Sequence, residues 1–192
     1  MAPERDVTVL LERWRSGDRE AADALVSATY DQMRRVARSF FRQERRDHTL
    51  QPTALVHEAY LRLFQDKPVS LESREAFFRL LASQMRRQLI DHARRRSAGK
   101  RGGDMRKGSL DEYIDLIPAA LVNSTEDELQ ALDGALEQLG AEHPRVANII
   151  QLRYFADMSL DEVAATMKLS AGTIKRELSF ARAWLARALT QS

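Results

Sequence analysis

The strongest constraint on the fold is a pair of closely spaced helix starts within residues 158–189. Ser159 and Glu162 have the spacing of a capping box, in which each side chain accepts a hydrogen bond from the other residue's backbone amide. Ser170 supplies a second cap a short interval later. Two helices joined by so few residues cannot lie in line, so the segment predicts a helix-turn-helix. The apolar pairs expected to flank the two caps are Met158 with Val163 and Leu169 with Ile174.

The second helix of this motif is expected to present hydrogen-bond donors and cations to solvent. Such a helix can enter the major groove of DNA, where these groups meet base edges and phosphates. Arg176 is placed to read a base, whereas Arg182, further along the helix, is better placed to meet a phosphate. The segment therefore predicts binding to duplex DNA. The candidate contacts are Ser170, Thr173, Lys175, Arg176, Ser179 and Arg182.

Apolar residues recur at helical spacing along the rest of the chain, and no segment alternates with period two over a useful length. We therefore expect an all-α fold with two small helical domains joined by a flexible acidic linker. The expected boundaries are residues 1–101, 102–124 and 125–192. Helix starts are predicted at Asp18, Pro52, Ser73, Pro144 and a capping box of Thr125 with Glu128, and helix ends at Gly17 and Gly140.

The charges of the chain are strongly segregated, although the net charge is only +2. A basic block spans residues 86–107, and an acidic stretch follows it over residues 111–128. A run of cations is often only a solvated helix end, but a block of this density after an apolar stripe favours a nucleic-acid surface. The cations of the block are Arg86, Arg87, Arg94, Arg95, Arg96, Lys100, Arg101, Arg106 and Lys107.

Several classes of function find no support in the sequence. The chain has no cysteine, so disulfides and thiolate metal sites are excluded. His57 and Glu58 begin a zinc-protease pattern, but Leu61 stands where the second histidine ligand would be. We found no catalytic set or phosphate-binding glycine loop, and so expect neither an enzyme nor a cofactor. No apolar run is long enough to span a membrane and no leader is evident, which predicts a cytoplasmic protein.

Three blocks in this order resemble the extracytoplasmic-function class of bacterial sigma factors over nearly the whole chain. They are LVHEAYLRLF at residues 55–64, MRRQLIDHARRR at 85–96 and GTIKRELSFARAWLARAL at 172–189. The resemblance implies that the protein binds core RNA polymerase, at the clamp and flap of its large subunits, and promoter DNA. The first domain, region 2, would recognise the minus-ten element and hold the separated strand. The second domain, region 4, would read the minus-thirty-five element.

The resemblance also implies two sets of contact residues in the first domain. A cationic surface that holds single-stranded DNA is physically consistent with the arginines of the second block. The implied minus-ten contacts are Arg86, Arg87, Asp91, Arg94, Arg95 and Arg96. The implied polymerase contacts are Gln51, Thr53, Leu55, Val56, Glu58, Ala59 and Arg62.

The chain departs from the family pattern at two places. Lys168 stands where many members have glycine in the helix-turn-helix, at a cost of about 1 kcal/mol if the backbone there is left-handed. Residues 51–54, Gln-Pro-Thr-Ala, stand where the family usually carries an acidic stretch that contacts the polymerase clamp. A phosphate on Thr53, in the first turn of a helix, would restore negative charge there. The plainer interpretation is that Thr53 only caps the helix.

Two other classes of function remain open from the sequence. A helix-turn-helix repressor or activator would bind duplex DNA without polymerase. A basic helical RNA-binding protein or adaptor would bind nucleic acid with a strong salt dependence and little promoter preference. An anti-sigma factor or a Ser/Thr kinase is the expected kind of regulator under the sigma interpretation, and no membrane contact is expected.

Overall fold

A computed structural model of the chain describes residues 6–41, 51–65, 72–97 and 126–190. These residues form helices with no strand among them, which confirms the all-α fold class. The expected linker, the Thr125 cap and the end of the basic block lie outside the described residues. The helices are α1 (Val7–Arg15), α2 (Glu20–Phe41), α3 (Pro52–Gln65), α4 (Arg74–Ser97), α7 (Glu126–Glu142), α8 (Pro144–Ile150), η2 (Gln151–Phe155), α9 (Leu160–Met167) and α10 (Ala171–Thr190).

Side-chain caps begin helices α1, α2 and α4. The Asp6 carboxylate accepts a hydrogen bond from the Thr8 amide (2.8 Å) at the start of α1. Asp18 accepts one from the Glu20 amide (3.0 Å) and Ser73 one from the Ala76 amide (3.1 Å). The caps predicted at Asp18 and Ser73 are therefore confirmed. Each satisfies an amide that the first helical turn leaves without a partner.

A buried hydroxyl pair joins α2 to α3. The Thr29 hydroxyl donates to the Leu25 carbonyl (2.7 Å) within α2, so the Tyr60 hydroxyl of α3 donates to Thr29 Oγ1 (2.7 Å). Burial raises the pKa of Tyr60 well above its ordinary value, which keeps the phenol protonated as the donor. A buried polar group that finds a partner in this way fixes the register of the two helices.

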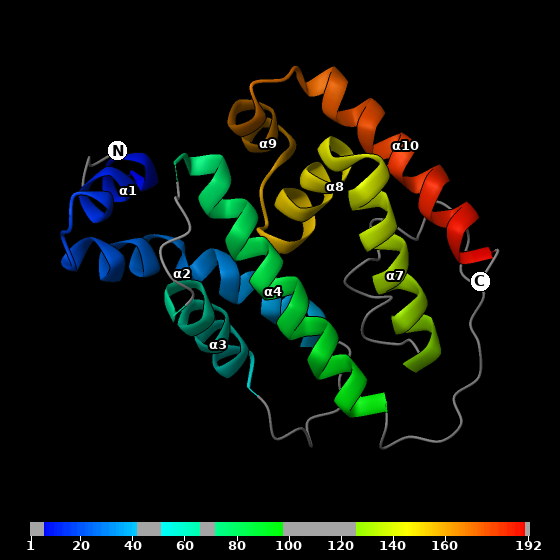
Figure 1. Ribbon diagram of the computed structural model, residues 1–192, viewed down its shortest axis with the longest axis horizontal. Helices are drawn as coiled ribbons and strands as arrows, with labels where there is room; N and C mark the ends of the chain where they lie inside the picture. Colours follow the sequence, from blue (N-terminus) through cyan, green and yellow to red (C-terminus); the bar gives the residue numbers. More distant parts are fainter. Residues whose placement is uncertain (1–5, 42–50, 66–71, 98–125, 191–192) are drawn as a thin grey trace.

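Helix α4 lies between the two halves of the molecule. Figure 1 shows it running diagonally, with α1 and α3 on one side, α7, α8 and α9 on the other, and α2 passing behind it. It packs against α3 on the first side and against α7, η2 and α9 on the second. Gln88, Leu89 and Ile90 are consecutive and all buried, which no helix achieves against a single neighbour. The core of the protein therefore passes continuously through α4.

The carboxyl-terminal half departs from the predicted helix boundaries at two places. Helix α7 passes through Gly140 and ends at Glu142, because the His143 amide still donates to the Leu139 carbonyl (2.8 Å) and Pro144 then starts α8. The predicted end at Gly140 is wrong. A π-helical turn, η2, extends α8 and is closed by the bond from the Ala156 amide to the Gln151 carbonyl (3.1 Å). Nothing in the sequence signals this widened turn.

The turn between α9 and α10 has a left-handed residue at its centre. Lys168 ends α9 with φ 55° and ψ 42°, and the following Leu169 amide donates to the Ala164 carbonyl (2.9 Å). This is the left-handed helix ending that glycine usually supplies. Lys168 stands where many members of the similar family have glycine, and it adopts the left-handed conformation. A side chain in this conformation costs about 1 kcal/mol.

Candidate nucleic-acid interface

Both predicted caps of the helix-turn-helix are present. Ser159 Oγ accepts from the Glu162 amide (3.2 Å), and Glu162 Oε2 accepts from the Ser159 amide (2.8 Å), which completes the capping box. Ser170 Oγ accepts from the Thr173 amide (3.1 Å) at the start of α10. Met158, Val163 and Ile174 are all buried, as expected for the apolar partners of these caps. The local sequence thus sets where both helices start.

Helix α10 has one buried face and one open face. Ile174, Leu178 and Ala181 are buried against the rest of the carboxyl-terminal half. An ion pair between Arg145 of α8 and Glu177 holds the helix from its flank. Gly172, Lys175 and Arg176 near its amino-terminal end are exposed, so this end can approach another surface.

The predicted contacts of α10 differ in accessibility. Ser170, Lys175, Arg176 and Ser179 are exposed, and Thr173 is half-buried with its hydroxyl 2.9 Å from that of Ser170. Arg176 also reaches Thr173 Oγ1 at 3.5 Å, which keeps its guanidinium over the first turn. Arg182 is half-buried and has interactions within the protein. The exposed set clusters in the first turns of the helix.

The structure divides the arginines of α4 into two groups. Arg87 is exposed, whereas Arg86 and Arg94 both donate to the Asp133 carboxylate of α7, at 2.7 and 2.9 Å. Arg86 also donates to the Asp133 backbone carbonyl (3.1 Å). The remaining expected contacts of this helix are Asp91, which is half-buried, and Arg95 and Arg96, whose side chains lie outside the described residues.

The expected polymerase contacts on α3 also separate by burial. Leu55, Val56 and Ala59 lie in the core and present no side chain to a partner. Gln51 is exposed and Thr53 is half-buried in the first turn. Arg62 is half-exposed and pairs with Glu58 (3.0 Å). It also donates to the side-chain oxygen of Gln88 on α4 (3.0 Å) when that amide faces it.

Sequence reasoning missed the residues that connect the two halves of the molecule. Asp133 sits on the inner face of α7 but belongs to no motif. Gln32 of α2 donates to the Ala156 carbonyl, and Arg35 of α2 pairs with Asp157 (2.8 Å). These are single polar residues far apart in the chain, and no local pattern identifies the partner of any of them.

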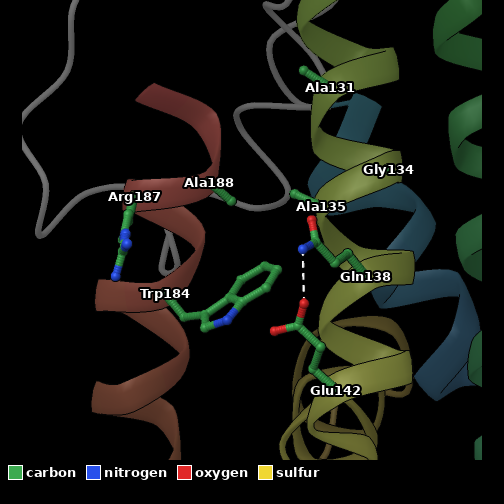
Figure 2. Close-up of a pocket in the computed structure, with 8 residues that line it drawn as sticks. All are labelled: Ala131, Gly134, Ala135, Gln138, Glu142, Trp184, Arg187 and Ala188. Carbon is green, nitrogen blue, oxygen red and sulfur yellow. Dashed lines mark hydrogen bonds between the residues drawn. The ribbon is translucent and has the colours of Figure 1, made fainter. Parts of the chain in front are cut away.

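A shallow pocket lies between α7 and α10, with Trp184 pointing from α10 toward α7 (Figure 2). The Gln138 amide donates to Glu142 (2.7 Å) at its edge. Half of its lining residues are alanine or glycine, and the lining offers neither a nucleophile with its base nor a set of metal ligands. Its lining residues are Ala131, Gly134, Ala135, Gln138, Glu142, Trp184, Arg187 and Ala188.

No group of acidic or histidine side chains in the described part of the chain is arranged to hold a metal ion. Among the helices that the structure describes, none is both long and apolar enough to cross a membrane.

One comparison with known proteins gives a match. A sequence model of the family described as ECF sigma factor matches residues 4–191 of the 192-residue chain. No curated protein and no solved structure matches the chain. The match spans both halves of the molecule, including α4 and the helix-turn-helix.

The capping box predicts a pH dependence of stability. The hydrogen bond from the Ser159 amide holds the pKa of Glu162 below its ordinary value of 4.5. The unfolded chain therefore binds this proton more readily, so the contribution of Glu162 is present at neutral pH and lost as pH falls through the folded pKa. We expect Glu162→Gln, which can still accept the bond, to make the unfolding free energy less dependent on pH below about 4.5.

Urea denaturation between neutral and acid pH measures this effect, with Asp161→Asn as the matched control. Asp161 is exposed in the same helical turn and is not part of the box. Equal pH dependence in wild type and Glu162→Gln, or an equal change in both variants, would contradict the assignment.

Proposed function

Since the chain belongs to the ECF sigma factor family, we propose that it binds core RNA polymerase and directs it to promoters through two DNA-contacting surfaces. The family places the protein in promoter-directed transcription, as a regulatory DNA-binding factor and not an enzyme. One observation carries the proposal. The family match covers nearly the whole chain, and the helix-turn-helix lies within the matched residues. A protein with this role would act in the cytoplasm, where polymerase is found.

In this proposal α10 reads the minus-thirty-five element as duplex DNA. The exposed residues Lys175, Arg176 and Ser179 lie in its first turns, on the face opposite the buried Ile174 and Leu178. A helix that presents this end can insert into the major groove while its buried face stays packed. Arg176 is the candidate for a bidentate contact to guanine, and Ser170 and Thr173 are placed for backbone or base contacts.

Helix α4 would hold the minus-ten element, including the strand that separates there. Arg87 is exposed and would bind the phosphates of that strand. Arg86 and Arg94 extend the same cationic surface toward α7. Single-stranded nucleic acid is bound by cationic grooves whose affinity falls steeply with salt. Arg95 and Arg96 continue the charge of the helix in sequence.

The polymerase contact would use Gln51, which precedes α3, and the accessible residues Thr53, Glu58 and Arg62 of α3. The buried Leu55, Val56 and Ala59 would act by fixing the position of the helix. Thr53 occupies the second position of α3, after Pro52, where the helix dipole favours an anion. Phosphorylation of Thr53 by a Ser/Thr kinase would add about −1.5 to −2 charge at neutral pH. That charge would replace the acidic residues this chain lacks at 51–54.

Run-off transcription with purified core polymerase tests the proposal. The protein should produce promoter-dependent transcripts, and Arg176→Ala should relax selectivity at one base pair by about 1–3 kcal/mol. The matched control is Arg187→Ala, which removes an exposed cation near the other end of α10. Selectivity is measured by letting promoter variants that differ at one base pair compete as templates in the same reaction.

Failure to support initiation on any genomic fragment would overturn the proposal. Duplex DNA binding that represses or activates without contact to core polymerase would favour a conventional helix-turn-helix regulator. Salt-sensitive binding to RNA with no transcription would favour the RNA-binding alternative.

The Thr53 proposal predicts a charge-dependent affinity for core polymerase. Thr53→Glu should bind more tightly than Thr53→Ala, because it supplies negative charge at the start of α3. Fluorescence anisotropy with labelled protein measures both affinities, and Thr190→Glu at the exposed end of α10 controls for added charge elsewhere. Equal binding by Thr53→Ala and Thr53→Glu would exclude the switch.

A further inference from the structure

Phe180 is an aromatic residue on the open face of α10, and it is 42% exposed. Among the residues that the structure describes, the other large apolar side chains exposed to a comparable degree are Val9 and Leu61, and both lie in the amino-terminal half. A single exposed apolar residue is common on protein surfaces. What Phe180 can bind is therefore decided by the residues around it.

Phe180 shares its face of α10 with the proposed base-reading residue. It follows Arg176 by four residues, so the two side chains lie on the same side of the helix and about 6 Å apart along its axis. Ile174, Leu178 and Ala181 occupy the opposite, buried face. Base pairs are about 3.4 Å apart along DNA. A helix that inserts Arg176 into a major groove therefore brings Phe180 into the same groove, about two base pairs away.

The ring of Phe180 is held by His143, the residue before α8. The two rings meet edge-to-face, with their centroids 4.8 Å apart and their planes at 79°. His143 occupies the cap position of α8, but its side chain makes no cap hydrogen bond and packs on Phe180 instead. A ring pair of this kind restricts the orientations of the exposed ring, which lowers the entropy that binding must remove.

The charges around this ring favour DNA over a protein partner with an apolar surface. Arg176 and Arg187 are exposed on α10, as is Lys175. The single carboxylate of α10, that of Glu177, is 15% exposed and pairs with Arg145 of α8. The open face of the helix is therefore cationic. An apolar partner would have to remove water from these cations, whereas a polyanion binds them.

The major groove of DNA presents one apolar group that such a ring can contact. This group is the 5-methyl group of thymine, and phenylalanine is among the side chains that recognise it. We propose that Phe180 determines specificity by contacting the methyl group of a thymine in the minus-thirty-five element, while Arg176 reads a neighbouring base pair through hydrogen bonds. This inference rests on the proposed role of α10. It adds an apolar contact to a surface for which the sequence predicted only polar ones.

Replacing thymine with uracil tests this contact, because uracil pairs with adenine in the same way and lacks only the methyl group. The probe is a fluorescein-labelled duplex that carries the sequence most enriched from a randomised library by the full chain with core polymerase. Further duplexes carry uracil at one thymine at a time. We expect one of them to bind about fourfold more weakly to the unchanged protein with core polymerase, the effect of losing one buried methyl group. That thymine should lie within about two base pairs of the position whose selectivity Arg176→Ala relaxes.

Phe180→Ala should bind the thymine and uracil duplexes with equal affinity, because no ring is left to contact the methyl group. Phe180→Leu keeps an apolar side chain and should retain part of the difference. Val9→Ala is the matched control, since it removes an apolar side chain of similar exposure, 39%, from α1 in the other half. It should retain the full difference.

Phe180 lies outside the apolar core, so all three variants should keep the helical circular dichroism of the parent. If Phe180→Ala loses that signal, Phe180→Leu decides by the same comparison. A reduced difference between thymine and uracil in Phe180→Leu supports the contact, and a full difference overturns it.

A uracil series without effect on the unchanged protein would overturn the inference, as would an undiminished difference in Phe180→Ala. Weaker binding of Phe180→Ala to core polymerase, with the thymine preference retained, would overturn it in favour of a protein contact. In these cases Arg176→Ala still relaxes selectivity if the proposed function is correct, so the two failures are distinguishable. If the library yields no enriched duplex, the proposed function and this inference both fail.

Discussion

Burial of α4 on two sides is the constraint on which the rest of the structure depends. A helix between two layers is buried around most of its circumference, and Gln88, Leu89 and Ile90 are buried in three consecutive positions. Its amino-terminal half completes the core of the first three helices through Phe77, Phe78 and Leu81. Its second side then receives η2, α7 and α9, so the carboxyl-terminal half is oriented by this helix.

The charges of α4 follow from the same arrangement. A cation on the second side must either stay at the rim or find an anion, because burying an unpaired guanidinium is costly. Asp133 supplies that anion for Arg86 and Arg94 at once. Arg87 remains exposed. One helix thus combines a buried core stripe with arginines at its rim, two of which pair with Asp133.

Local features of the sequence predicted the helix starts well. Asp18, Ser73, Ser159 and Ser170 each cap a helix through a side chain, and this chemistry depends only on residues two or three positions away. The end of α7 was mispredicted because Gly140 is only a weak helix breaker, whereas Pro144 is a strong one. The π-helical turn was not foreseen because a widened turn has no marker residue.

The candidate site was predictable only where its residues are close in sequence. The helical spacing of the apolar residues predicts which side chains of α10 are exposed. Lys175, Arg176 and Ser179 are exposed in the structure, in agreement with that spacing. The division of the α4 arginines was not predictable, because it depends on Asp133, which is distant along the chain. The same holds for Gln32 and Arg35, which meet the loop after η2. Pairs of this kind need the tertiary structure, since each member alone resembles an ordinary surface residue.

We propose that one chain connects core RNA polymerase to two promoter elements, through α4 and α10. The most direct measurement is a footprint of promoter DNA with core polymerase, taken with and without the protein. We expect both elements to be protected only when the protein is present. Protection that does not depend on the protein would contradict the proposal.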